Sequence, residues 1–232
     1  LKTNTSLKMK KLLILFTIAI TLIACNNEPK VDYALFSGTI TNPVGEEIIV
    51  SGSDFNQKIT VNAEGVFADT LKIVSGYYTF SHGRESSTFY LASGYDLNMT
   101  LDTKEFDETI TYVGMGSENN NYLAAKYLNN EKNSLDVPTL YAMEQPEFLD
   151  AVNEFKTSNN EFLSNTDNLD ENFDALEKES NHFDYLLNLQ QYEGYHKYFA
   201  KKENVEVSED FTNPFKGFDY ENDKLISLGD IA

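Results

Sequence analysis

The only cysteine of the chain, Cys25, is the residue whose chemistry the sequence specifies most closely. It follows Leu22, Ile23 and Ala24 at the end of an apolar run. This order matches a lipobox, in which the thiol accepts a diacylglycerol and the small residue before it lets a peptidase reach the bond to be cleaved. We therefore predict that Cys25 is lipidated. A single cysteine also excludes an intrachain disulfide, a CxxC redox pair and a multi-cysteine metal site.

The residues before Cys25 have the pattern of a secretion signal. Met9-Lys10-Lys11 is a basic start, and the apolar run 12–23 has the length of a signal core, whereas a membrane span needs ~20 residues. We expect residues 1–24 to be a signal peptide, in which 1–8 are upstream read-through before a start at Met9, and residues 25–32 to be a lipidated tether. The alternatives are an ordinary signal peptide with an incidental cysteine, or a short anchor helix.

A lipid-anchored chain belongs to the cell envelope, facing the periplasm or the cell surface. A second acyl chain on the new N-terminus would give the two membrane signals that stable anchoring requires. Asn26 stands where some lipoproteins carry the Asp that retains them at the inner membrane. The sequence therefore favours the outer membrane.

No other motif predicts catalysis, a metal site or a cofactor. His182 and His196 are fourteen residues apart on one expected helix, about 21 Å along its axis, so they cannot share a metal; His82 lies far from both in the sequence. There is no HExxH, no GxSxG and no DxDxDG calcium loop, and Gly114-Met115-Gly116 is too short for a dinucleotide fingerprint. Structural or surface roles are expected for the three histidines.

Three tyrosines form the candidate binding surface of the sequence. Tyr192, Tyr195 and Tyr198 recur at helical spacing, with Phe199 beside them. Such a cluster can pack in a core or interface, or it can form an aromatic platform for a ligand. Both interpretations stay open at the level of sequence.

The charge of the chain limits its partners. Four of the 18 basic residues precede Cys25, so the remaining chain has 14 basic against 37 acidic residues, a net charge of −23. A surface this negative repels nucleic-acid phosphates and anionic lipid. We expect no nucleic-acid partner and attribute the charge to a solubilising surface.

The pattern of apolar residues predicts an α+β fold with two parts. Residues 33–116 alternate in short runs separated by Gly, Asn and Asp turns, as in an antiparallel β-sandwich or barrel-like domain. Strands are expected at 33–40, 47–51, 57–61, 66–73, 77–81, 87–91, 96–101 and 109–113, with 102–108 as a solvated loop.

Residues 117–205 are expected to form an α-helical hairpin or bundle against the sheet. Ser117 can cap a first helix over 118–130, with Tyr122, Leu123 and Tyr127 on one side. Pro146 stands near the start of a second helix that ends near residue 165. A third helix is expected over 170–203. Periodicity fades after Val205, so 206–232 is expected to be a linker toward a further C-terminal region.

Five segments of the chain carry strand-and-turn motifs. They are Phe36-Ser37-Gly38-Thr39-Ile40, Asn62-Ala63-Glu64-Gly65-Val66-Phe67, Gly76-Tyr77-Tyr78-Thr79-Phe80, Phe89-Tyr90-Leu91-Ala92-Ser93-Gly94-Tyr95-Asp96-Leu97 and Thr111-Tyr112-Val113-Gly114-Met115-Gly116-Ser117-Glu118-Asn119. Together these segments resemble the all-β domain of unknown function, with a helical segment after it, that precedes the thioredoxin fold in ResA/TlpA-like, AhpC/TSA-associated thiol-disulfide oxidoreductase lipoproteins. The resemblance covers roughly residues 30–225, and its motifs are degenerate turn-and-strand patterns.

The catalytic WCxxC of that family is missing from this chain, so no catalytic residue can be carried over. The resemblance implies a non-catalytic N-terminal module that positions a thioredoxin-like domain or binds partners. The alternative is a stand-alone envelope lipoprotein that binds a ligand or a protein.

Overall fold

The computed structural model describes residues 31–216. Cys25 and its lipobox residues lie outside the described residues, as do the signal segment and the part of the expected linker after Lys216. Within residues 31–216, no helix combines the length and apolar character that crossing a bilayer requires.

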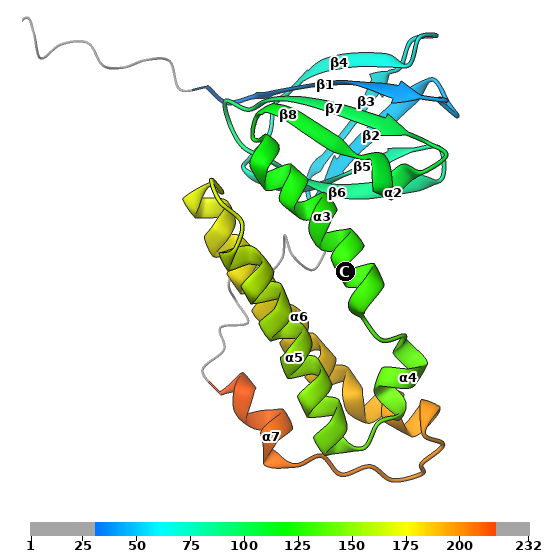
Figure 1. Cartoon of the computed structure of the whole chain (residues 1–232), viewed down its shortest axis with the longest axis vertical. Helices are drawn as coiled ribbons and strands as arrows, with labels where there is room; N and C mark the ends of the chain where they lie inside the picture. Colours follow the sequence, from blue (N-terminus) through cyan, green and yellow to red (C-terminus); the bar gives the residue numbers. More distant parts are fainter. Residues whose placement is uncertain (1–30, 217–232) are drawn as a thin grey trace, which may run out of the picture. The chain divides into compact units, whose positions relative to one another are not determined.

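The fold is α+β, with an N-terminal β-sandwich followed by helices (Figure 1). Sheet A has the order β4-β1-β7-β8, and sheet B has the order β3-β2-β5-β6. The strands are β1 (Ala34–Thr41), β2 (Glu47–Gly52), β3 (Phe55–Thr60), β4 (Val66–Leu71), β5 (Gly76–His82), β6 (Glu85–Leu91), β7 (Asp96–Asp102) and β8 (Thr111–Met115). All eight expected strands are present, with ends shifted by a few residues.

One strand pair departs from the expected antiparallel arrangement. β1 and β7 run parallel, with Phe36 opposite Leu97, whereas every other described pair of neighbouring strands is antiparallel. The chain crosses to sheet B after β1 and returns only for β4 and β7. No hairpin therefore fixes the relative direction of β1 and β7.

Aromatic side chains fill the space between the sheets. Phe36 of sheet A and Phe89 of sheet B are fully buried, with ring centroids 4.9 Å apart. Phe80 meets Phe89 edge to face at 5.5 Å. Alternation of buried and exposed residues along β1 and β7 puts the other side chains of sheet A on an outer face that none of the described helices covers (Figure 1).

The segment between β7 and β8 is not the solvated loop that its charges suggested. Residues Phe106–Thr109 form the short helix α2, and Phe106 is buried against Phe80, at 6.0 Å between ring centroids. One apolar residue among carboxylates was enough to anchor the segment to the core.

The helices α3 (Ser117–Asn133), α4 (Val137–Ala142), α5 (Gln145–Ser164), α6 (Glu171–Phe199) and α7 (Glu209–Thr212) follow, with a final 3-10 turn, η1 (Asn213–Phe215). Ser117 does not cap α3. The cap position belongs to Gly116, whose φ of 95° is in the left-handed region that glycine adopts without strain. Tyr127 is exposed, unlike Tyr122, which is buried. α4 was not expected, and α6 ends before residue 203.

Two adjacent asparagines of α3 each pair with one residue on an edge strand of the sandwich. The side chain of Asn120 bonds to both the N–H and the C=O of Tyr90 in β6. The side chain of Asn121 does the same with Tyr112 in β8. β6 and β8 are the edge strands of sheets B and A, so α3 supplies side chains where a further strand would otherwise pair.

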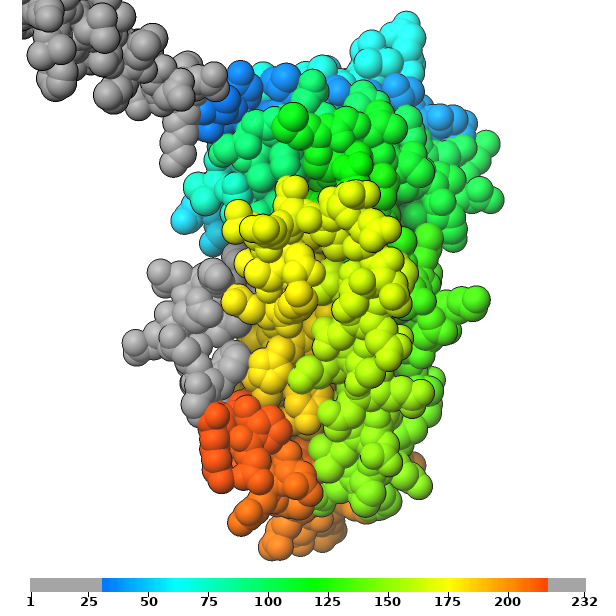
Figure 2. Space-filling model, turned by 60° about the vertical axis from the view of Figure 1, so that its left-hand side comes forward, coloured from blue at the N-terminus to red at the C-terminus, as the bar shows by residue number. Residues whose placement is uncertain are grey.

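The described chain from Tyr33 onward packs as one compact unit with two hydrophobic cores. The first core joins the sandwich to Tyr122, Leu163 and Phe173 of the helices, and Figure 2 shows the start of α6, in yellow, adjoining the sandwich. The second core lies within the helical layer and includes Phe211 of α7. Residues 206–216 are therefore packed structure in the part of the expected linker that the structure describes.

Candidate functional site

The three histidines serve separate local roles. His82 is buried; its Nε2 accepts a hydrogen bond from the N–H of Val44, so Nδ1 donates to the carbonyl of Glu47. His196 is buried on the ring of Tyr192, and its Nδ1 donates to the carbonyl of Tyr141. Among residues 31–216, no three His, Cys, Asp or Glu side chains gather where a metal could bind.

A buried polar cluster around an ion pair joins two helices to the sandwich. Lys126 Nζ of α3 lies 2.7 Å from Glu177 Oε2 of α6, and the carboxylate is 2% exposed. Tyr77 of β5 donates its hydroxyl to the other oxygen of Glu177. Burial, together with the neighbouring carboxylate, raises the pKa of Tyr77 far above its ordinary value. This cluster connects three elements, and such buried pairs fix a conformation more than they add net stability.

A second polar cluster lies at the start of α6. Tyr95 donates its hydroxyl to the carboxylate of Asp170, the residue that precedes α6. Asn119 of α3 donates to both groups, at 2.6 and 3.0 Å, and accepts from the N–H of Asp170 at 3.1 Å. These hydrogen bonds join the start of α6 to α3 and to the residue before β7, so the cluster positions α6 against the sandwich.

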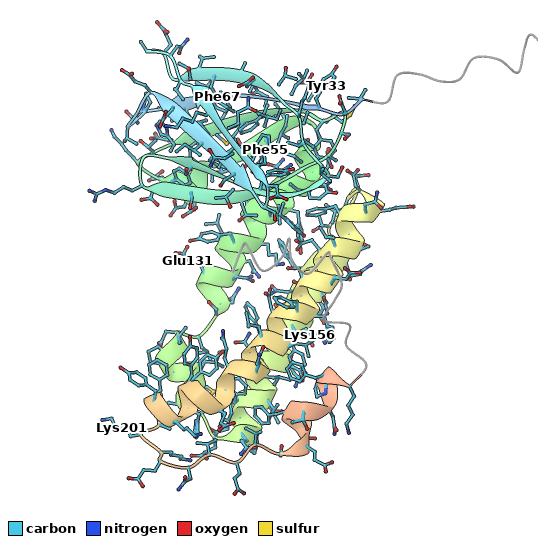
Figure 3. The ribbon with its side chains drawn as sticks, turned by 180° about the vertical axis from the view of Figure 1, so that it is seen from behind. Tyr33, Phe55, Phe67, Glu131, Lys156 and Lys201 are labelled. Carbon is cyan, nitrogen blue, oxygen red and sulfur yellow. The ribbon has the colours of Figure 1, made fainter. Side chains whose placement is uncertain are left out.

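Lys156 lies midway along the helical layer (Figure 3). Its ammonium lies 3.2 Å from His182 Nδ1 and 4.6 Å from the centre of the Tyr185 ring. Burial lowers the pKa of Lys156, and burial followed by the charge of Lys156 lowers the pKa of His182. The arrangement holds α5 against α6 and opens into no described cavity.

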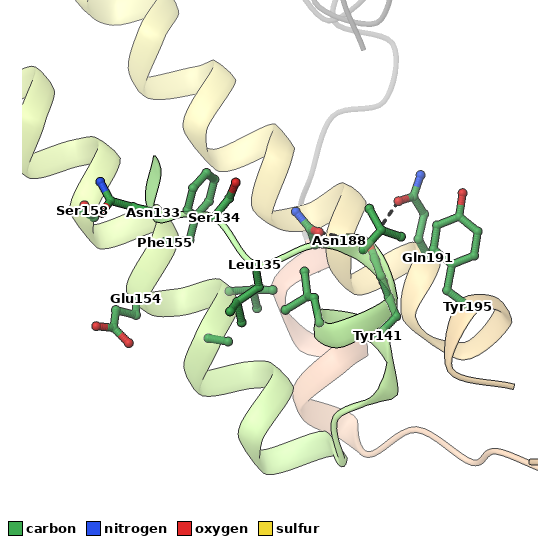
Figure 4. A pocket seen from close by; sticks show the side chains of 14 residues that line it. Asn133, Ser134, Leu135, Tyr141, Glu154, Phe155, Ser158, Asn188, Gln191 and Tyr195 are labelled. Atoms are coloured by element: carbon green, nitrogen blue, oxygen red, sulfur yellow. Dashed lines mark hydrogen bonds between the residues drawn. The ribbon is translucent and has the colours of Figure 1, made fainter. Parts of the chain in front are cut away.

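A groove of about 700 Å³ lies between the end of α3, α4, α5 and α6 (Figure 4). Cavities that hold small organic ligands have volumes of about 300–1,000 Å³. The apolar part of its lining comes from Leu135, Val137, Leu140, Ala151, Val152 and Phe155. Leu135 and Val137 remain about half exposed, so the groove meets solvent through apolar side chains.

The polar groups of the groove are chiefly hydroxyls and amides. The hydroxyl of Tyr141 lies 3.0 Å from Asn188 Oδ1 and 3.1 Å from Gln191 Oε1 of α6, and these two oxygens share its single proton. Burial raises the pKa of Tyr141 to about 12. Glu154 is the one charged residue among the lining side chains. This composition can bind a partly apolar molecule and orient it with amide groups.

The three tyrosines expected to form one surface are separated by the structure. Tyr192 is fully buried, with its ring 4.4 Å from that of Phe148 and its hydroxyl donating to the carbonyl of Met143. It is a core residue and cannot be part of a binding surface. Tyr195 lines the groove and meets Tyr141 edge to face at 4.8 Å. Tyr198 is 75% exposed and lies outside the groove lining.

The groove was not predicted, in part because α4, which forms one of its walls, was not predicted. The sequence does carry a helix-start pattern for α4. Asp136 is the N-cap and accepts a hydrogen bond from the N–H of Thr139, and Pro138 lies in the first turn. Six residues are too few for a hydrophobic period, so only the cap could have revealed this helix.

No protein-family model matches the sequence, and no curated protein matches it. One solved structure, a candidate cell adhesion protein from Bacteroides ovatus, is 11% identical, and the match spans 37% of this chain and 43% of that one. Its TM-score of 0.23 is too low to support an argument about fold or function.

Proposed function

We propose that this chain is a non-catalytic, lipid-anchored envelope protein that binds a ligand or a protein partner through the groove between α3, α4, α5 and α6. The observation that carries the proposal is the groove itself. It has the volume of a ligand site, an apolar wall, and amide groups from α6 beside it. Lipid on Cys25 would hold the module at the membrane.

Binding can be measured with the neutral, apolar dye Nile red on the full chain. We expect Tyr195→Ala to weaken the enhancement of dye fluorescence severalfold, because Tyr195 contributes an aromatic wall. Tyr127→Ala is the matched control, since Tyr127 is similarly exposed and lies outside the groove lining. Equal dye binding by the two variants would refute the groove as the binding site.

The lipid anchor has its own test. Mass spectrometry of the mature protein should find an acylated N-terminal peptide that begins at Cys25, and Cys25→Ser should move the protein from the membrane fraction to the soluble one. An unmodified Cys25 in a membrane-bound protein would refute the anchor.

A second candidate function is the accessory N-terminal module of a thioredoxin-like oxidoreductase. Its support is the resemblance of segments that form the turn between β3 and β4, the strand β5, the run from β6 into β7, and the junction of β8 with α3. The test is genomic, because the reading frame beyond Ala232 should encode a WCxxC motif. An immediate stop codon would eliminate this candidate and leave the groove-binding proposal intact.

A further inference from the structure

The outer face of sheet A has an unusual composition for so acidic a chain. The register places two rows of side chains across this face at the end where β1 begins. One row holds Thr70, Leu35, Asp96 and Met115; the next holds Ala68, Ser37, Asn98 and Val113. Asp96 is the only charged residue in either row, and Met115 and Val113 are each 63% exposed.

Further apolar side chains lie at the same end of the sandwich. The backbone carbonyl of Tyr33, which precedes β1, accepts a hydrogen bond from the N–H of Gly94, and Tyr33 is 39% exposed. Val74 is 82% exposed, and the next residue, Ser75, accepts from the N–H of Ser93, the neighbour of Gly94. Figure 3 shows Tyr33 at this end of the sandwich. The exposed residues Tyr33, Leu35, Val74, Val113 and Met115 are called the β1-start patch below.

The length of the tether connects this patch to a lipid surface. Only seven residues, 26–32, separate Cys25 from Tyr33. Even fully extended, at about 3.5 Å per residue, the tether keeps Tyr33 within about 28 Å of an acylated Cys25. A module anchored this closely meets the bilayer at a high effective concentration, so a patch too weak to bind alone can still be engaged.

We propose that the β1-start patch rests on the lipid headgroups and orients the anchored protein on the membrane. This inference rests on the lipid anchor of the proposed function. The chemistry fits a zwitterionic bilayer, because apolar side chains and a tyrosine favour the interface whereas the net negative charge opposes anionic lipid. Figure 1 shows α4 at the other end of α3 from β8, so the groove that α4 lines would lie at a distance from the membrane surface.

The experiment uses the acylated full chain on phosphatidylcholine vesicles. Because acylation consumes Cys25, a new cysteine can be labelled with an environment-sensitive dye. Val74→Cys reports on the patch. Val44→Cys is the matched control, since Val44 is also an exposed valine, in the loop that follows the opposite end of β1. We expect the emission of the dye to shift to the blue, and to be quenched severalfold more strongly by brominated lipid, only when the dye is at position 74. Adding Leu35→Asp and Met115→Asp should abolish the difference.

The outcomes separate the two proposals. A chain that does not attach to vesicles refutes the anchor, and this inference falls with it. A chain that attaches but shows equal signals at positions 74 and 44 refutes the orientation and leaves the anchor standing. The third outcome is seen without vesicles, in the Cys25→Ser chain labelled at position 74. If the dye emission there shifts to the blue as the protein concentration rises, a second copy of the chain covers the patch, and the membrane assignment is overturned.

Discussion

The side chain of Asn120 pairs with the backbone of Tyr90 as a neighbouring strand would. Its Oδ1 accepts from the N–H of Tyr90 at 2.7 Å, and its Nδ2 donates to the carbonyl at 2.9 Å. Asn120 is 1% exposed, so water cannot replace these bonds. Both hydrogen-bonding groups of an edge-strand residue are thereby satisfied from a helix.

We expect Asn120→Ala to lower the free energy of unfolding by about 2–4 kcal/mol, because two buried backbone groups lose their partners. Asn121→Ala is the matched control, since Asn121 makes the same pair of bonds to Tyr112 but is exposed. Urea unfolding should show the larger loss for Asn120. Equal losses would mean that burial does not determine the contribution of these caps.

The ion pair between Lys126 and Glu177 predicts strong non-additivity. Lys126→Met should destabilise the chain by about 3–5 kcal/mol, because it leaves a buried carboxylate without its cation. Lys126→Met combined with Glu177→Leu should recover much of that loss. Lys178→Met breaks an exposed pair with Asp174 and should change stability by about 0.5 kcal/mol or less. A double variant as unstable as the sum of its single variants would contradict this account.

Strands such as β1 and β7 could be predicted because they alternate between buried and exposed residues, whereas β6, which ends in three consecutive buried residues, depended on its apolar and β-branched composition. Phe36 and Leu97 stand in clear period-two runs, and both are fully buried. The parallel pairing of β1 with β7 could not be predicted, because it joins segments about sixty residues apart and depends on the whole path of the chain. Local patterns specify strands, whereas their order in a sheet is a non-local property.

The candidate site in the helical layer could not be predicted for the same reason, because it also depends on contacts between distant parts of the chain. The spacing of Tyr192, Tyr195 and Tyr198 indicates a helix but does not tell which side of it meets α5. That side depends on Phe148 and Phe211, which pack on Tyr192 from distant parts of the chain. Tyr195, three residues after Tyr192 on α6, lines the groove instead. A groove formed by four elements has no signature in any one of them.

The pH dependence of stability should carry a contribution from Asp184. Burial, opposed in part by Lys126, raises the pKa of this carboxyl above 3.8. The protonated form is therefore favoured in the folded state, so its stabilising contribution is complete below pH 3.8 and is lost as the pH rises through the folded pKa. Asp184→Asn should raise the melting temperature at pH 7 and have little effect near pH 3.5. A variant that melts lower than the parent at pH 7 would show that the ionised carboxylate is stabilising.

Phe211 packs α7 into the second core. Phe211 is 3% exposed, with its ring 4.8 Å from Tyr192 and 5.9 Å from Phe148. Phe211→Ala should destabilise the second core by about 3–5 kcal/mol, since it removes a buried ring and leaves a cavity. If residues 206–216 were a linker, the substitution would have no effect on stability. Hydrogen exchange distinguishes the two cases, because loss of the ring should increase exchange in α7 and in the facing turns of α5 and α6. Thr212→Ala, on an exposed position of the same helix, is the control that should leave the exchange of α5 and α6 unchanged.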